Sequence, residues 1–451
     1  MAGQIAHLLT SDESQRIADA VVQRLDDAIA FLTEVVKVPS ENPKLTGRAP
    51  AEEGQCQDLI GARLDALGMD VDRFEALPGR PNVVGRKVGT GAGRSLVFNG
   101  HVDVVPAGDA DDWRYPPFEG VVADGAVWGR GACDMKGGLV TALLAIEALA
   151  VAGVDLAGDI LVHSVVDEET GGSGTRAAIE HGSVADGAIC VEPTNLEVMP
   201  VEGGLEWLRL IVHGVAGHTA LRYKSVHAGG GAPATNAIEK MVKILTAVQS
   251  LEREWGIRKR HPLLPVGITT INPGIMLGGT GGGADGMPHI ITSPSTFPDY
   301  CSLELSLKYL PSETREDVRR EFETFIGHVA ATDPWLAEHP PEIEWGVRGV
   351  SFPPAETSPD HPLITTLARQ IQAVADRPLV ITGFTAVSDI AWLAEAGIPC
   401  TLFGPGRADY AHAVDERIAI DEIRVGAVIL ACTAAEWCGI VRHAPSRAGD
   451  E

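Results

Sequence analysis

One short segment, Gly100-His101-Val102-Asp103, places an imidazole two residues before a carboxylate. It lies in a nearly continuous apolar run, Ser95–Val105, of the kind that forms a strand buried on both faces of a sheet. Because side chains two residues apart on a strand point the same way, Asp103 can lie beside the His101 ring. A carboxylate there fixes the imidazole tautomer, as it does around metal-binding histidines. The alternative is a buried His–Asp pair whose two side chains only hydrogen-bond to each other. This segment alone does not decide between a metal site and such a pair.

Two further segments place carboxylates beside predicted elements. Asp134 lies in the glycine-rich connection Gly129–Gly138, where it could bridge two cations or cap the helix that follows. Glu168 and Glu169 follow the apolar run Asp159–Val166 after a single intervening residue. Adjacent glutamates after a buried strand are costly unless a positive charge compensates them. One could then bind a metal while the other acts as general base, whereas on a solvated loop the pair would have no such role.

Two more candidate ligands complete a set of nitrogen and oxygen donors. Glu192 follows a third apolar run, and His412 comes after a fourth run and the turn Gly404–Gly406. Since open α/β sheets gather their sites at the carboxyl ends of strands, we expect the candidates to meet at one edge. The predicted metal ligands are His101, Asp134, Glu169, Glu192 and His412. Imidazole and carboxylate without thiolate suit zinc, cobalt or manganese. HExxH, Walker and GxSxG patterns are absent, and we interpret the other glycine-rich stretches as structural.

The strands that would position these groups alternate with amphipathic or Ala/Leu-rich helices, predicted over residues 12–36, 52–68 and 137–149. This order is typical of an α/β layered domain with a mostly parallel sheet flanked by helices. Between residues 203 and 345 the pattern changes to alternating strands, 207–213 and 301–309, around a helix at 236–251. We therefore predict a catalytic domain from residues 1–202 and 346–451, with an α+β domain inserted over 203–345. Gly278–Gly286 is predicted to be a flexible loop.

Composition excludes several classes of function. The 451 residues carry 36 Lys+Arg against 61 Asp+Glu, a formal net charge of -25, which argues against nucleic acid and anionic membrane surfaces as partners. The sequence contains neither a long uncharged apolar run nor a secretory signal at its N-terminus. Its seven scattered cysteines form no CxxC pair and indicate reduced thiols. We expect a cytoplasmic protein.

Read together, the motifs resemble the co-catalytic zinc superfamily of acetylornithine deacetylase, succinyl-diaminopimelate desuccinylase, aminoacylase and glutamate carboxypeptidase. The resemblance spans roughly residues 15–440. Its carriers are GHVDVVP at 100–106, WRYPPFEG with DGAVWGRGACDMKGG within 113–138, VDEETGGSGT at 166–175, VEPT at 191–194 and GPG…AHAVDE at 404–416. Each motif alone is weak, whereas the five in this order are specific.

The resemblance assigns roles to the candidate residues. It implies that His101 and Glu192 bind one cation, that Glu169 and His412 bind the other, and that Asp134 bridges them. Glu168 would be the general base, and Asp103 would orient His101. The resemblance also implies that the inserted domain over 203–345 is the family's lid and dimerisation domain, which mediates dimers and supplies a histidine to the partner's site. His218, in Gly217-His218-Thr219, matches that histidine and would stabilise the oxyanion. Asn236 falls at a further contact of that domain.

Two departures from the family pattern concern the substrate. Where relatives usually carry an arginine that holds a substrate carboxylate, this chain has Lys308, which cannot reproduce the bidentate fork. The lid is also lengthened around His227–Gly231 and Gly278–Gly286. We expect Lys308 and Arg407 to contact substrate.

The resemblance implies a dinuclear amidohydrolase that cleaves an N-acyl amino acid to a carboxylate and a free amino acid. It would use two divalent cations, zinc favoured, and act as a homodimer. A dipeptidase or carboxypeptidase using the same site is the alternative. A non-enzymatic binding protein is disfavoured, because every ligand position and the base are filled.

Overall fold

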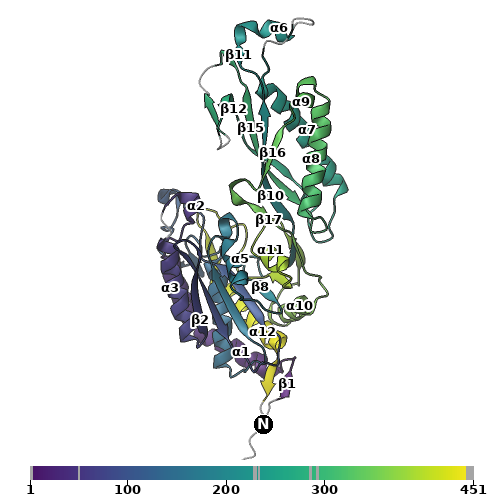
Figure 1. The fold of residues 1–451 in the computed structure, drawn as a ribbon. Coiled ribbons are helices and arrows are strands. Elements are labelled where there is room, and N and C mark those ends of the chain that lie inside the picture. Colours follow the sequence, from purple (N-terminus) through teal and green to yellow (C-terminus); the bar gives the residue numbers. More distant parts are fainter. Residues whose placement is uncertain are drawn as a thin grey trace, which may run out of the picture. The chain divides into compact units, whose positions relative to one another are not determined.

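A computed structural model describes residues 4–48, 51–226, 231, 234–283, 287–290 and 294–442. The chain divides into two compact units (Figure 1). The first, here the catalytic unit, comprises Met1–Val201, Ala355–Phe384 and Ser388–Glu451, and the second, here the inserted unit, comprises Glu202–Pro354 and Thr385–Val387. In the described part of the chain, no helix is long and apolar enough to cross a membrane.

The catalytic unit is built on a sheet of strand order β18-β9-β20-β8-β4-β7-β3-β2, in which β18 is Ala355–Glu356, and β19 (Ile381–Phe384) lies beside β9. Its four central strands run parallel: β20 (Cys400–Leu402), β8 (Ala188–Cys190), β4 (Leu96–His101) and β7 (Ile160–Val165). The flanking strands are antiparallel: β2 (Asp70–Leu77), β3 (Arg80–Lys87) and β9 (Val198–Glu202). The four central strands are buried throughout, as their continuous apolar sequences predict. The predicted α/β class with a mostly parallel sheet is confirmed.

Helices cover this sheet. α1 (Ser11–Val36), α4 (Lys136–Val151) and α12 (Ile420–Cys438) pack against one another, and the last two also against β4. α4 is buried along most of its length, which explains its Ala/Leu-rich composition. The remaining helices are α2 (Pro43–Thr46), α3 (Ala51–Ala66), α5 (Ser173–Glu180), α10 (Pro362–Val374) and α11 (Ile390–Glu395). A small antiparallel sheet of β5 (Val121–Ala123), β6 (Ala126–Trp128) and β21 (Arg417–Ala419) joins two distant parts of the chain.

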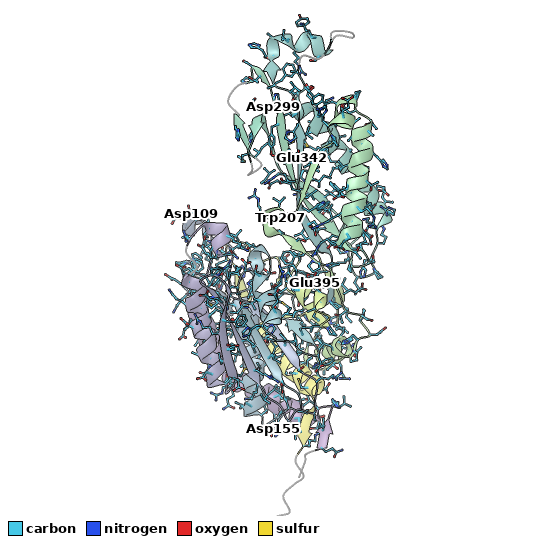
Figure 2. All side chains as sticks on the ribbon, in the orientation of Figure 1. Asp109, Asp155, Trp207, Asp299, Glu342 and Glu395 are labelled. Carbon is cyan, nitrogen blue, oxygen red and sulfur yellow. The ribbon has the colours of Figure 1, made fainter. Side chains whose placement is uncertain are left out.

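The inserted unit is an antiparallel sheet covered by helices. Its central strands are β10 (Gly204–His213) and β15 (Tyr300–Tyr309), with β12 (Ile271–Gly282) and β16 (Glu342–Trp345) outside them. α7 (Ala237–Arg258) and α8 (Arg315–Ala331) bury their apolar faces in a common core with these strands. Figure 2 shows the side chains, with Trp207 on β10 and Glu342 on β16 labelled.

Two expectations for this unit need correction. It extends to Pro354, beyond the boundary predicted at residue 345, because β17 (Ser351–Phe352) pairs with β10. The predicted loop Gly278–Gly286 begins as strand, since Gly278 and Gly279 continue β12 and pair with Cys301 and Tyr300. Glycine is required there, because a Cβ on Gly282 would lie 2.2 Å from the Tyr300 ring. Residues 284–286 of that segment and residues 227–230 of the other lengthening lie outside the described residues.

Candidate active site

The parallel strands carry the candidate residues to one edge of the sheet. His101 is the last residue of β4, Glu168 and Glu169 lie in a short 3-10 turn just after β7, and Glu192 follows β8. Because these three strands are adjacent and parallel, their carboxyl ends lie side by side. Asp134 precedes α4, and His412 lies between β20 and β21.

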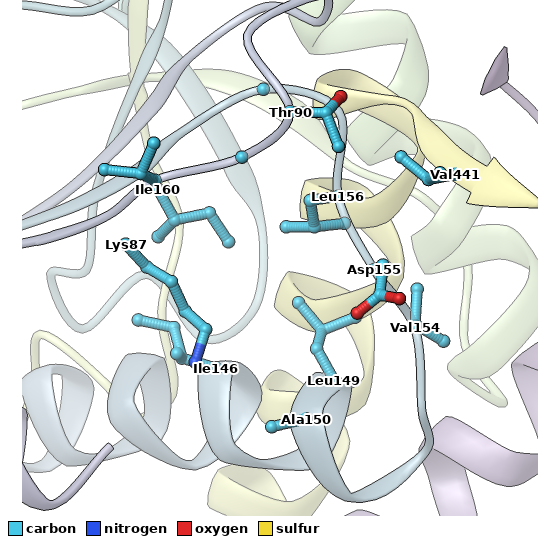
Figure 3. A pocket seen from close by; sticks show the side chains of 13 residues that line it. Lys87, Thr90, Ile146, Leu149, Ala150, Val154, Asp155, Leu156, Ile160 and Val441 are labelled. Carbon is cyan, nitrogen blue, oxygen red and sulfur yellow. The ribbon is translucent and has the colours of Figure 1, made fainter. Parts of the chain in front are cut away.

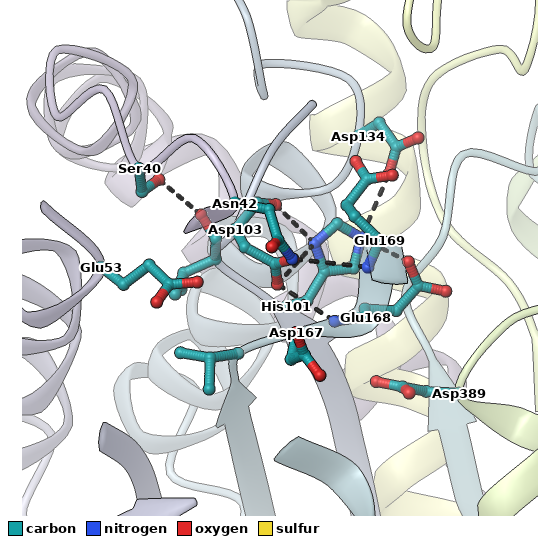
Figure 4. A network of polar contacts seen from close by, with 12 residues as sticks. Ser40, Asn42, Glu53, His101, Asp103, Asp134, Asp167, Glu168, Glu169 and Asp389 are labelled. Carbon is teal, nitrogen blue, oxygen red and sulfur yellow. Dashed lines mark hydrogen bonds and ion pairs between the residues drawn. The ribbon is translucent and has the colours of Figure 1, made fainter. Parts of the chain in front are cut away.

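These residues meet in one cluster of two imidazoles and four carboxylates. His101 Nε2 lies 3.2 Å from Asp134 Oδ1 and 3.7 Å from a carboxylate oxygen of each of Glu168 and Glu192. His412 Nε2 lies 3.3 Å from Asp134 Oδ2 and 3.0 Å from Glu169 Oε2. Asp134 therefore stands between the two imidazoles and presents one oxygen to each, as Figure 4 shows for His101. All five predicted ligands and the predicted base are brought together.

The cluster is largely buried and short of positive charge. Burial raises the pKa values of Glu168, Glu169 and Glu192 above the usual range of a carboxyl group. Burial also opposes ionisation of Asp134, but the two imidazoles outweigh it and lower the pKa of that carboxyl. Hydrogen bonds to Asp134 and Glu169 raise the pKa of His412 to about 10.

Two buried atoms of the cluster have no hydrogen-bond partner, His101 Nε2 and Glu169 Oε1. Ligand atoms of His101, Asp134 and Glu169, and separately of His101, Glu168 and Glu192, lie within 4.8 Å of one another. Divalent cations fit this arrangement, because they would satisfy the two unpaired atoms and compensate the excess of carboxylates.

Asp103 makes different contacts from those predicted. The backbone carbonyl of Asp103 lies 2.8 Å from His101 Nδ1, whereas its carboxylate is 3.8 Å away. The side-chain alternation that the prediction used does not reach residue 103, because β4 ends at His101. An Nδ1–H that donates to this carbonyl leaves the Nε2 lone pair facing the carboxylates, so the backbone of Asp103 can fix the tautomer.

The Asp103 carboxylate instead holds the turn that carries the two glutamates. It accepts hydrogen bonds from the backbone N–H groups of Glu168 (3.2 Å) and Glu169 (3.3 Å), and from Asn42 Nδ2 (2.7 Å) (Figure 4). Asn42 Nδ2 is also 3.1 Å from Thr170 Oγ1 in the same turn. Asp103 therefore connects the strand of His101 to the turn of the candidate base.

A buried ion-pair network beneath the turn was missed by the sequence analysis. Asp167, with a left-handed backbone (φ 71°), accepts hydrogen bonds from Arg80 and Lys44 (2.6 Å each), and Arg80 also binds Glu53 through two 2.7 Å bonds. Asp389 is buried as well, and its charge helps to raise the pKa of Glu168. Nothing in the sequence signals these partners, because each pair is far apart in the chain.

Four predicted residues make other contacts, each within its own unit. His218 is on β11 (Gly217–His218) of the inserted unit, where its Nδ1 accepts the N–H of Ala220. Asn236 caps α7 by accepting the N–H of Glu239, and Lys308 Nζ donates to the carbonyl of Thr385 in the same unit. Arg407, in the catalytic unit, is exposed and pairs with Asp409 at 2.9 Å. These contacts give Asn236, Lys308 and Arg407 structural partners.

A pocket of about 370 Å³ in the catalytic unit lies away from the cluster (Figure 3). Ile160, the first residue of β7, lines it together with Lys87 and Asp155. Since Glu168 follows the opposite end of β7, this pocket is at the other edge of the sheet and is not part of the candidate site.

Comparisons with known proteins agree with this geometry. Residues 97–436 match the model described as peptidase family M20/M25/M40. The N-formyl-4-amino-5-aminomethyl-2-methylpyrimidine deformylase of Halalkalibacterium halodurans is 35% identical over 92% of this chain and 95% of its own length. The succinyl-diaminopimelate desuccinylase of Cereibacter sphaeroides is 28% identical over 88% and 95%.

Solved structures share the fold at lower identity. Aminopeptidase PepT from Bacillus cereus superposes with a TM-score of 0.67 at 18% identity, over 92% of this chain and 98% of that one. The YXEP protein of Bacillus subtilis, described as a dinuclear metal binding peptidase, gives 0.62 at 13% identity, over 92% and 98%.

Proposed function

The chain belongs to peptidase family M20/M25/M40 and is a hydrolase of amide bonds, and we propose that it removes a formyl group from the aminomethyl nitrogen of an aminopyrimidine. The products would be formate and the free primary amine. The observation that carries amide hydrolysis is the cluster itself, in which Asp134 stands between His101 and His412 with Glu168 beside His101.

The leaving group is inferred from similarity and from Lys308. The deformylase relative is 35% identical over 95% of its length, against 28% for the desuccinylase. Lys308 stands where an arginine fork for a substrate carboxylate is expected, and its ammonium is bonded to the Thr385 carbonyl. An aminopyrimidine carries no carboxylate and does not need that fork.

We assign the metal roles to the five clustered residues. His101 and Glu192 would hold one divalent cation and Glu169 and His412 the other, with Asp134 shared. Bound cations, with zinc favoured and cobalt or manganese as alternatives, polarise an amide carbonyl and lower the pKa of water.

Glu168 would move the proton. Its carboxylate is largely buried, with 11% of the side chain exposed, and lies beside His101. A base in that position takes a proton from the attacking water and returns it to the nitrogen that leaves. Burial raises the pKa of Glu168, and a carboxylate of higher pKa is the stronger base. Asp103 would keep Glu168 in place through the hydrogen bond to its N–H.

A substrate panel separates this proposal from its rivals. We expect kcat/KM for N-formyl-4-amino-5-aminomethyl-2-methylpyrimidine to exceed that of its N-acetyl analogue by about 10- to 200-fold, because a pocket fitted to one acyl carbon discriminates against an added methyl group. N-acetyl- and N-succinyl-amino acids and dipeptides should be poorer still. Faster turnover of succinyl-diaminopimelate would support the N-acyl amino acid class as the second candidate, and faster turnover of a dipeptide would indicate a peptidase.

We also propose that two chains associate through the inserted unit and that His218 of one chain acts on the substrate of the other. Neither a His218→Ala nor a Glu168→Gln homodimer should then hydrolyse substrate at an appreciable rate. When the two variants are mixed and allowed to exchange, half of the dimers would be mixed and would have one complete site. Activity should return to about a quarter of the wild-type value, because half of the dimers are mixed and each of these has one complete site out of two. If mixing restores nothing although exchange is shown by mass spectrometry, His218 does not act across the dimer.

All seven cysteines lie within the described residues, where they are buried and form no disulfide. This supports the expectation of a reducing, cytoplasmic environment.

A further inference from the structure

The two histidines of the cluster differ in how firmly the fold holds them. His101 ends a buried strand, and its side chain is 1% exposed. His412 lies in a surface segment with a left-handed backbone (φ 59°), and its side chain is 53% exposed. Packing alone therefore constrains His412 weakly, and another contact must hold it against Asp134.

Glu416, four residues after His412, reaches the segment that carries Asp134. Its Oε1 accepts the backbone N–H groups of both Cys133 and Asp134, each at 2.9 Å. Its Oε2 accepts Arg130 Nη1 at 2.5 Å, and the Glu416 side chain is fully buried. All three donors come from one short segment of the chain, 130–134.

Arg130 completes the connection in the opposite direction. Its Nη2 donates to the backbone carbonyl of His412 at 3.3 Å, and 2% of the residue is exposed. Its guanidinium lies 5.2 Å from the centre of the Trp113 ring, a favourable cation–π contact. Glu416 and Arg130 thus form a buried ion pair, here called the clamp. Glu416 binds the backbone of the segment that carries Asp134, and Arg130 binds the backbone of His412.

Backbone hydrogen bonds also join the two segments that carry the clamp. The N–H of Gly129 donates to the carbonyl of Glu416 at 2.9 Å, and β6 pairs with β21 just beyond, with Trp128 opposite Arg417. The β6–β21 pairing fixes the position of residues 126–128 relative to residues 417–419. The charge-assisted hydrogen bonds of the clamp then fix the neighbouring residues Asp134 and His412 relative to each other. Such bonds are about twice as strong as neutral ones and are directional, so they suit this task.

We propose that Glu416 and Arg130 are positioning residues that set the spacing of Asp134 and His412, and so determine the affinity for the cation held by His412 and Glu169. The inference rests on the proposed two-cation site. The cation at His101 and Glu192 should be affected less, because neither His101 nor Glu192 is bonded to the clamp.

The test is the binding of zinc to the metal-free chain, followed by calorimetry and by competition with a chelating dye. Glu416→Gln keeps the shape and one acceptor oxygen but cannot accept from both Arg130 and the two N–H groups. We expect wild type to bind two equivalents. Glu416→Gln should bind one nearly as tightly as wild type and the second about 10- to 100-fold more weakly, the usual effect of losing an outer partner of a ligand. Excess zinc should restore kcat, which it would not do for a general loss of structure.

Glu206→Gln is the matched control. Glu206 is fully buried in the inserted unit and pairs with Arg319 at 2.8 Å, so its replacement also removes a buried charge. This variant should still bind two equivalents of zinc with wild-type affinity. Arg130→Lys is the second variant, used if Glu416→Gln does not fold, because lysine keeps the charge but cannot reach Glu416 and the His412 carbonyl together.

The possible failures are distinguishable. If wild type binds two equivalents and the clamp variant that folds also binds two with wild-type affinity, the positioning role is wrong while the proposed function stands. If wild type itself binds fewer than two equivalents at saturation, the two-cation site fails and this inference fails with it. Equal weakening at both sites would also overturn the assignment of the clamp to one cation.

Discussion

Replacing Glu168 by glutamine is expected to lower kcat for amide hydrolysis by about three orders of magnitude while the chain keeps its metal. General acid–base catalysis contributes about 10²- to 10⁴-fold, and glutamine has the shape of glutamate but cannot take up a proton. The carboxylate is largely buried beside His101, and its raised pKa suits a group that both accepts and returns a proton. Steady-state kinetics and metal analysis of the same preparation measure the two quantities.

The structure also supplies the rival to this assignment. Ligand atoms of Glu168, His101 and Glu192 lie within 4.8 Å of one another, so Glu168 could itself be a ligand. In that case Glu168→Gln would lose metal together with activity. Turnover within about tenfold of wild type would contradict a role as base. Glu180→Gln, an exposed glutamate at the end of α5, is the control and should change neither quantity.

Removing the metal is expected to abolish activity and to lower the melting temperature by roughly 10 °C. A ligand present at about 1,000 times its dissociation constant stabilises the folded state by about 4 kcal/mol, and each kcal/mol shifts Tm by about 2–4 °C in a domain of this size. Without cations, the four carboxylates of the cluster have only two imidazoles to compensate them. Calorimetry before and after chelation, and after addition of zinc, cobalt or manganese, measures the effect.

Asp134→Asn provides the matched comparison for this experiment. Asp134 is the carboxylate that contacts both imidazoles, so its loss should remove most of the metal-dependent stabilisation. Chelation should then shift the melting temperature of the variant little. If chelation changes neither the melting temperature nor the activity of the wild-type chain, the cluster binds no functional cation.

Much of the site could be predicted because it follows from strand geometry. The apolar run that ends in His101 and the runs that precede Glu168, Glu169 and Glu192 are parallel strands in the structure, and their carboxyl ends lie at one edge of the sheet. Alternation and helical periodicity likewise placed β10, β15 and α7, whose positions depend mainly on local pattern.

What could not be predicted depends on contacts between distant segments. The Arg80–Asp167 pair and the Glu416–Arg130 pair join residues 87 and 286 positions apart, and neither leaves a periodic signal. The contacts of Asp103 differ from the prediction because the strand stops two residues earlier than the alternation required. Pairing with Cys301 and Tyr300 likewise decides that the glycines after Leu277 form strand and not loop.

The most direct test of the account is a crystal structure of the zinc-loaded protein with anomalous diffraction recorded at the zinc edge. We predict two anomalous peaks in the catalytic unit, one bound by His101 and Glu192 and the other by Glu169 and His412, with Asp134 contacting both. A single peak, or peaks that these five side chains do not touch in fully loaded crystals, would contradict it.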